Sequence, residues 1–160
     1  MNDDVLRKQL VAQLETGQAY IKIGEAIRKF PSELAGERID GIAHTAWEIL
    51  EHMRIAQWDI LRFTIDPDHV TPLWPDEHWP PTSAPADTAE WERSLGVFFA
   101  ELEQVKELAR NPETDLYQVI PHGTGQTVLR EILLVADHNA YHLGQFMMIR
   151  RALERREAAA

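Results

Sequence analysis

Apolar residues recur three and four positions apart along most of this chain, the spacing that places side chains on one face of an α-helix. The pattern predicts four helical segments: about Asp3 to Phe30, about Asp40 to Phe63, Thr88 to about Asn111, and from just after Gly125 to about Arg155. No stretch shows the strict alternation of apolar and polar residues that is typical of a half-buried strand. The sequence therefore predicts an all-α fold.

Capping and breaking residues mark the helix boundaries. Asp87-Thr88-Ala89-Glu90 resembles a capping box with aspartate as the cap, and Asn111-Pro112 closes the same segment. Pro31 ends the first segment. Between the capping box and Asn111-Pro112, apolar residues form the continuous stripe that a helix buries in a bundle core. They are Trp91, Leu95, Phe98, Leu102, Val105 and Ala109.

The linkers differ in length and therefore in what they can connect. About ten residues join the first two helices, which suits adjacent antiparallel helices. Residues 64–86 are rich in proline, carry Trp74 and Trp79, and can run the whole length of a helix. This segment predicts a long crossover between the second and third helices, and hence an up-down-down-up four-helix bundle. We expect it to cover one end of the bundle, with both tryptophans over the substrate pocket.

Composition narrows the class of protein. The 160 residues, 44% hydrophobic and 26% charged, suit a single domain, 1–160, with its own core. No apolar run is long enough to cross a bilayer, and the acidic start Met1-Asn2-Asp3-Asp4 lacks the pattern of a signal peptide, so we expect a cytoplasmic protein. A net charge of −10 disfavours nucleic acid as a partner. The chain has no cysteine, so any thiol chemistry needs a thiol from another molecule.

Three histidines in the middle of predicted helices are the strongest sign of chemistry. His138 and His142 lie four residues apart, so they share one side of a helix and can share a metal ion. His52 lies mid-helix in another segment, where a bundle can bring it level with the pair. Three neutral imidazoles without an evident fourth ligand are typical of an open, reactive metal site. The alternative is a set of partly buried histidines with ordinary hydrogen-bond partners.

Several residues near His52 have two possible roles each. Glu48 precedes it by one turn, where its carboxylate would orient an imidazole or act as the catalytic general base, unless it faces solvent. Asp59 lies near the same face of the helix. Its carboxylate either hydrogen-bonds a metal-binding histidine without binding the metal ion itself, or pairs with an arginine. His69 and His78 lie in the crossover, where we expect solvated side chains and, as the alternative, a fourth ligand.

Substrate contacts are expected around the histidine pair. The candidate side chains there are His122, Asn139, Tyr141 and Gln145. His122 would alternatively cap the turn before the fourth helix, and Tyr141 would alternatively pack at an interface. The fourth helix is apolar on more than one face, which predicts extra packing within the bundle or a homodimer.

Together these motifs resemble the DinB-like superfamily over nearly the whole chain. The strongest is Asp137-His138-Asn139-Ala140-Tyr141-His142-Leu143-Gly144-Gln145. Residues 45–52, 57–61, 74–80 and 123–131 support it. The resemblance implies an up-down-down-up bundle, often dimeric, with one divalent metal ion held by His52, His138 and His142. Relatives of known activity include S-transferases that use bacillithiol or mycothiol, and a mycothiol-dependent maleylpyruvate isomerase.

Three functions follow as hypotheses. The leading one is a metal-dependent S-transferase that adds a low-molecular-weight thiol to a small electrophile, with zinc or nickel as the preferred ion. The second is a metal-dependent hydrolase that uses water in place of the thiol, with Glu48 as the base. The third is a non-enzymatic, stress-related bundle whose metal ion is structural or vestigial.

Overall fold

The computed structural model describes residues 3–16 and 18–159, and within these residues every regular element is a helix. The all-α prediction is confirmed. The elements are α1 (Asp4–Glu15), α2 (Ile23–Ile27), the 3₁₀ turn η1 (Ser32–Leu34), α3 (Ala46–Ile65), the 3₁₀ turn η2 (Asp76–His78), α4 (Thr88–Arg110) and α5 (Val128–Ala158). Across the same residues, no helix is both long enough and apolar enough to cross a membrane.

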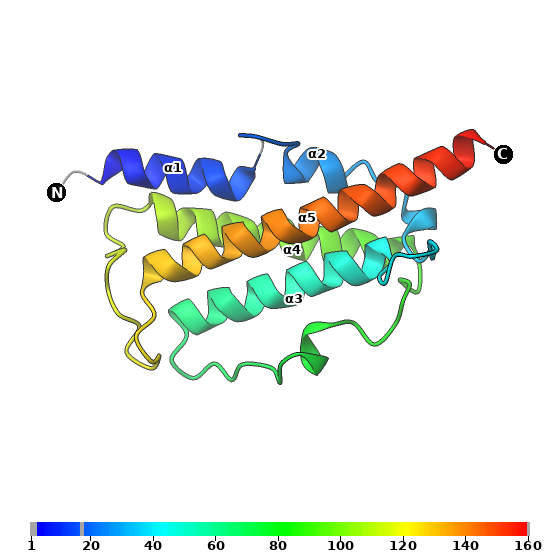
Figure 1. The fold of residues 1–160 in the computed structure, drawn as a ribbon. Helices are drawn as coiled ribbons and strands as arrows, with labels where there is room; N and C mark the ends of the chain where they lie inside the picture. The colour runs from blue at the N-terminus through cyan, green and yellow to red at the C-terminus, as the bar shows by residue number, and fades with distance from the viewer. Residues whose placement is uncertain (1–2, 17, 160) are drawn as a thin grey trace.

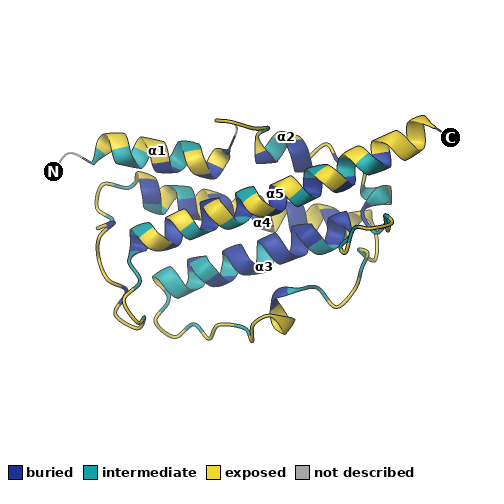
Figure 2. Cartoon of the chain, viewed as in Figure 1, coloured by how far each residue is buried: buried dark blue, intermediate teal, exposed yellow. Residues whose placement is uncertain are grey.

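The four long helices lie side by side (Figure 1). α1 and α5 run in one direction, and α3 and α4 run in the opposite one. α3 packs against both α4 and α5, and α1 packs against the same two helices from the other side of the core. Buried residues lie on the faces that the helices turn toward one another (Figure 2). This packing puts α3 and α5, which carry the three predicted ligands, in direct contact.

Residues 66–87 connect α3 to α4 and return along the side of α3 to its N-terminal end (Figure 1). Two hydrogen bonds fasten the end of this crossover to the start of α3. Thr45 Oγ1 donates to Ser83 O at 2.7 Å, and Trp47 Nε1 donates to Thr82 Oγ1 at 3.3 Å. The expectation that the crossover covers one end of the bundle is wrong, because it lies along the length of α3.

The first predicted helix, residues 3–30, is interrupted. α1 ends at Glu15, and Thr16 has a φ of 59°, outside the right-handed helical region. The Thr16 hydroxyl accepts a hydrogen bond from Ile23 N at 2.7 Å, where α2 begins. Periodicity alone did not reveal the break, because apolar residues on both sides of it keep helical spacing.

A reciprocal capping box fixes the start of α3 at Ala46, not near Asp40 as predicted. The Thr45 side chain accepts from Glu48 N at 3.2 Å, while Glu48 Oε2 accepts from Thr45 N at 2.7 Å. These bonds satisfy two N–H groups at the helix start, so the chain becomes helical here. α4 begins at Thr88 as predicted, and the carboxylate of its N-cap, Asp87, accepts from the backbone of the first turn.

A buried chain of hydrogen bonds crosses the core beside the apolar stripe of α4, which is buried as predicted. Gln57 of α3 donates through Nε2 to Phe98 O of α4 at 2.8 Å. It accepts through Oε1 from Asn139 Nδ2 of α5 at 2.9 Å. Gln57 and Asn139 are each 1% exposed, so these bonds fix the three helices relative to one another. Because Asn139 follows His138, the fixed point lies next to the histidines.

Candidate metal centre

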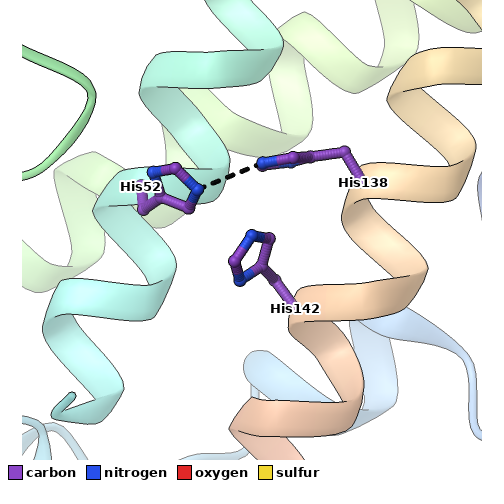
Figure 3. A group of neighbouring side chains, drawn as sticks. All are labelled: His52, His138 and His142. Carbon is purple, nitrogen blue, oxygen red and sulfur yellow. Dashed lines mark hydrogen bonds between the residues drawn. The ribbon is translucent and has the colours of Figure 1, made fainter. Parts of the chain in front are cut away.

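His52, His138 and His142 converge across the contact between α3 and α5 (Figure 3). His138 and His142 project from successive turns of α5 toward His52 on α3. One ring nitrogen of each histidine lies within 4.8 Å of the other two. His52 is 2% exposed and His142 is 6% exposed, whereas His138 is half-buried. The structure therefore brings the three predicted ligands together.

Hydrogen bonds fix which nitrogen carries the proton in two of the rings. His52 Nδ1 lies 2.7 Å from His78 O, and a carbonyl oxygen only accepts, so Nδ1 carries the hydrogen. His142 Nδ1 donates to Gln145 Oε1 at 2.8 Å in the same way. In both neutral rings Nε2 therefore has a free lone pair. An acceptor on the far nitrogen is the usual arrangement of a histidine that binds a metal ion.

The third ring completes a set of donors that fits one cation. His138 Nε2 lies 3.1 Å from His52 Nε2, and because the hydrogen of His52 is on Nδ1, His138 donates this hydrogen bond (Figure 3). Two nitrogen ligands of a tetrahedral zinc ion, with bonds of about 2.05 Å, lie roughly 3.4 Å apart, which is close to this separation. Within residues 3–16 and 18–159, this group contains no fourth histidine or carboxylate. Such a cation would keep an open coordination position.

Burial keeps the imidazoles neutral. It lowers the pKa of His52 from 6.5 to about 4, although the hydrogen bond to His78 O opposes the change. Burial, together with the neighbouring rings of His142 and His52, lowers the pKa of His138 from 6.5 to about 3. The pKa of His142 is also lowered, mainly by burial. Because metal ions bind the neutral imidazole, this environment prepares all three rings as ligands at neutral pH.

The two tryptophans predicted to cover the pocket both lie beside His52. Trp79 stacks on the His52 ring with centroids 3.9 Å apart and planes 4° apart, so it excludes water from one face of that ring. It also stacks on His44, with centroids 4.1 Å apart. The Trp74 ring lies 6.3 Å from His52 and 5.1 Å from His78. Trp74 is 66% exposed and forms the outer edge of the site.

Glu48, predicted to be catalytic, lies at the N-terminal end of α3. Its carboxylate completes the capping box with Thr45 and accepts from Arg38 Nη2 at 2.9 Å. The orienting role that the sequence suggested for this residue is filled by the carbonyl and amide oxygens described above. Its role as a general base stays a prediction.

Asp59 connects two histidines of the crossover to α3. Its Oδ1 accepts from His69 Nε2 at 2.7 Å, and its Oδ2 lies 3.4 Å from His78 Nε2. The side chains of His69 and His78 are 6% and 5% exposed, so the expectation of solvated loop histidines is wrong. A buried carboxylate gives both rings an acceptor and so permits their burial. The sequence signal is Asp59 itself, two helical turns after His52 and near the same face.

Two of the four predicted substrate contacts lie beside the histidine group. Gln145 holds His142 through the hydrogen bond already described. The Tyr141 ring lies perpendicular to the His142 ring, with centroids 4.9 Å apart, and is 66% exposed. Both residues therefore lie where they can influence the site.

The other two predicted contacts have structural roles. The Asn139 amide is used in its bond to Gln57 in the core. His122 donates through Nε2 to Phe63 O at 2.6 Å, near the C-terminal end of α3. That point lies about 16 Å along the helix axis from His52, so the structure does not bring His122 to the histidine group.

A cavity of about 250 Å³ adjoins the histidine group. It lies between α3, α5 and the crossover, and His138 forms part of its wall. Its remaining walls come from Ala56, Asp59, Ile60, Trp74, His78 and Leu134. A molecule bound in this cavity would therefore lie next to one of the three candidate ligands.

The likeness to known proteins lies in the part of the chain that forms this site. Residues 11–146 match the DinB superfamily. The matched range contains α3, α4, much of α5 and all three histidines. Of the curated proteins and the solved structures compared with the chain, none matches. Because the family match spans most of the 160 residues and includes the histidine group, the chain belongs to the DinB superfamily.

Proposed function

We propose that this protein is a metal-dependent S-transferase that joins a low-molecular-weight thiol to a small electrophile. The convergence of His52, His138 and His142 carries this proposal, because three neutral imidazoles, two buried and one half-buried, suit a cation with room for a reactant. Zinc and nickel are the ions that we propose. The chain belongs to the DinB superfamily, and the S-transferases that the resemblance implies among its relatives favour thiol transfer.

His52, His138 and His142 would hold the divalent cation, whose charge would lower the pKa of a bound thiol and so make its sulfur nucleophilic near neutral pH. In the overall reaction the thiol proton passes to solvent, and sulfur forms a bond to the electrophilic carbon. The leaving group departs with the electrons of its bond. The chain has no cysteine, so the sulfur comes from the cosubstrate.

The residues of this chain prepare the site before any cation binds. The backbone carbonyl of His78 holds His52 from one side, and Trp79 lies flat against its ring. Gln145 holds His142. Because these contacts already fix the ring orientations, less conformational freedom is lost when a cation binds. The cavity beside His138 would receive the electrophile.

Elemental analysis and a thiol-transfer assay on the same preparations test the proposal. The native protein should contain about one zinc or nickel ion per chain. It should consume an electrophile only when bacillithiol or mycothiol is added. His138→Ala should lose both the metal ion and the transfer activity. His122→Ala is the matched control, because that imidazole binds Phe63 O away from the group, and it should keep both.

Three results would refute the S-transferase or favour one of the other two functions. Metal-loaded protein that transfers neither thiol to any electrophile would refute the S-transferase and leave the metal centre intact. Hydrolysis of an ester or amide without added thiol would favour the hydrolase. A metal ion whose removal lowers the melting temperature, in a protein without either activity, would favour the non-enzymatic role.

We also propose an up-down-down-up four-helix bundle that forms a homodimer. The helix directions in Figure 1 support the bundle, with α1 and α2 together as its first segment. Exposed apolar side chains within one sector of α5 support the dimer. They are Leu133, Tyr141 and Met148, which are 47%, 66% and 64% exposed.

A further inference from the structure

The cavity beside His138 has an apolar side and an acidic side. The apolar side is formed by Ile60, Trp74 and Leu134. Asp59 and His78 form the polar side. The volume of about 250 Å³ corresponds to roughly eight water molecules. That is room for one ring with short substituents.

The polar side has hydrogen-bonding capacity that the protein does not use. Asp59 is 9% exposed; its Oδ1 is paired with His69 at 2.7 Å, whereas among the residues that the structure describes Oδ2 has only the long contact of 3.4 Å to His78 Nε2. A carboxylate can accept about four hydrogen bonds, so Oδ2 can take another donor. His78 Nδ1 is also buried and has no hydrogen-bond partner within the described residues.

We infer that this cavity is a binding subsite for an uncharged molecule with a flat apolar body and one hydroxyl or N–H group. The inference rests on the proposed function in one respect, that the occupant is the electrophilic substrate. The apolar body would pack between Trp74 and Leu134. The donor would bind Asp59 Oδ2, which places the molecule beside His138.

Asp59 would also exclude anions from the cavity. Solvent screens a nearly buried carboxylate weakly, so a second negative charge in a cavity of this size is disfavoured. The net charge of −10 acts in the same direction at longer range. Substrates with a carboxylate or phosphate should therefore bind more weakly than neutral molecules of the same shape.

A fluorine NMR titration of the metal-free protein at about pH 8, where an ordinary imidazole is uncharged, tests the subsite. The probes are para-fluorophenol, fluorobenzene and para-fluorobenzoate, which share a ring and differ in donor and charge. The phenol should bind about tenfold more tightly than either of the others. Because neither metal nor thiol is present, a failed transferase proposal leaves this result unchanged, and failure here leaves thiol transfer to its own assay.

Variants identify the residue that causes the preference for phenol over benzoate. Asp59→Asn removes the charge and keeps the shape, so the preference for phenol over benzoate should fall by about tenfold. Asp68→Asn, which changes an exposed aspartate at the start of the crossover, is the matched control and should leave the preference unchanged. Leu134→Trp fills the cavity and should abolish binding of every probe, which keeps the test decisive if Asp59→Asn does not fold.

Four results would overturn the inference. They are equal binding of phenol and benzoate to the native protein, no binding of any probe, an unchanged preference in folded Asp59→Asn, and undiminished phenol binding in Leu134→Trp.

Discussion

Acidification should destabilise the metal-free protein through the imidazoles of His52 and His138. In the folded state the pKa of His52 is about 4 and that of His138 about 3, whereas both return to 6.5 in the unfolded chain. Between these values the unfolded chain binds more protons than the folded one, so stability rises with pH. The contribution is fully present above about pH 6.5 and is lost as the pH falls toward 4.

The size of the effect follows from the difference between the two pKa values. At about pH 5, each ring should reduce the free energy of unfolding by about 2 kcal/mol relative to neutral pH. The Nε2 atoms of His52 and His138 lie 3.1 Å apart, so their protonation is coupled and the two costs do not simply add. Even one such cost is a large part of the stability of an ordinary domain, about 5–15 kcal/mol.

Urea denaturation in the presence of a chelator, at about pH 7.5 and about pH 5, measures this loss. His138→Gln keeps a polar group and removes the titration, so its loss between the two pH values should be smaller by about 2 kcal/mol. His122→Gln is the control, because it replaces an exposed histidine outside the group. An acid-induced loss of the same size in native protein and His138→Gln would refute the reasoning.

Three further predictions concern the core, the stacking of Trp79 on His52, and the oligomeric state. Gln57→Leu removes the bond to α4 and leaves the Asn139 amide of α5 unpaired in the core, so urea denaturation should show a free energy of unfolding lower by about 3 kcal/mol; a loss near zero would contradict this account. Trp79→Ala opens one face of His52 to water, so NMR titration of the metal-free variant should show a raised pKa for that ring; an unchanged pKa would mean that other groups bury it. Met148→Glu places a charge in the exposed apolar sector of α5, and light scattering should show a homodimer for the native protein and a monomer for the variant; a native monomer would contradict the dimer.

Local signals in the sequence determined the parts of this protein that depend on neighbours along the chain. α4 begins where Asp87 caps it, and its buried stripe follows from helical spacing. The pairing of His138 with His142 follows from their separation of four residues on one helix. These features were predictable because a cap or an i, i+4 pair is set within one helical turn.

Contacts between distant segments decided the rest, and spacing along the chain carries little information about them. Thr16 leaves the helical region within a segment whose apolar pattern still looks continuous, and its hydroxyl binds the start of α2. Asp59 pairs with two crossover histidines because the crossover folds back along α3. The carbonyl of His78, which holds His52, has no signature in the sequence, since every residue has a carbonyl. The residue types therefore determined which chemistry is available, and helix packing determined which groups meet, because burial and hydrogen bonding between segments exist only once the chain has folded.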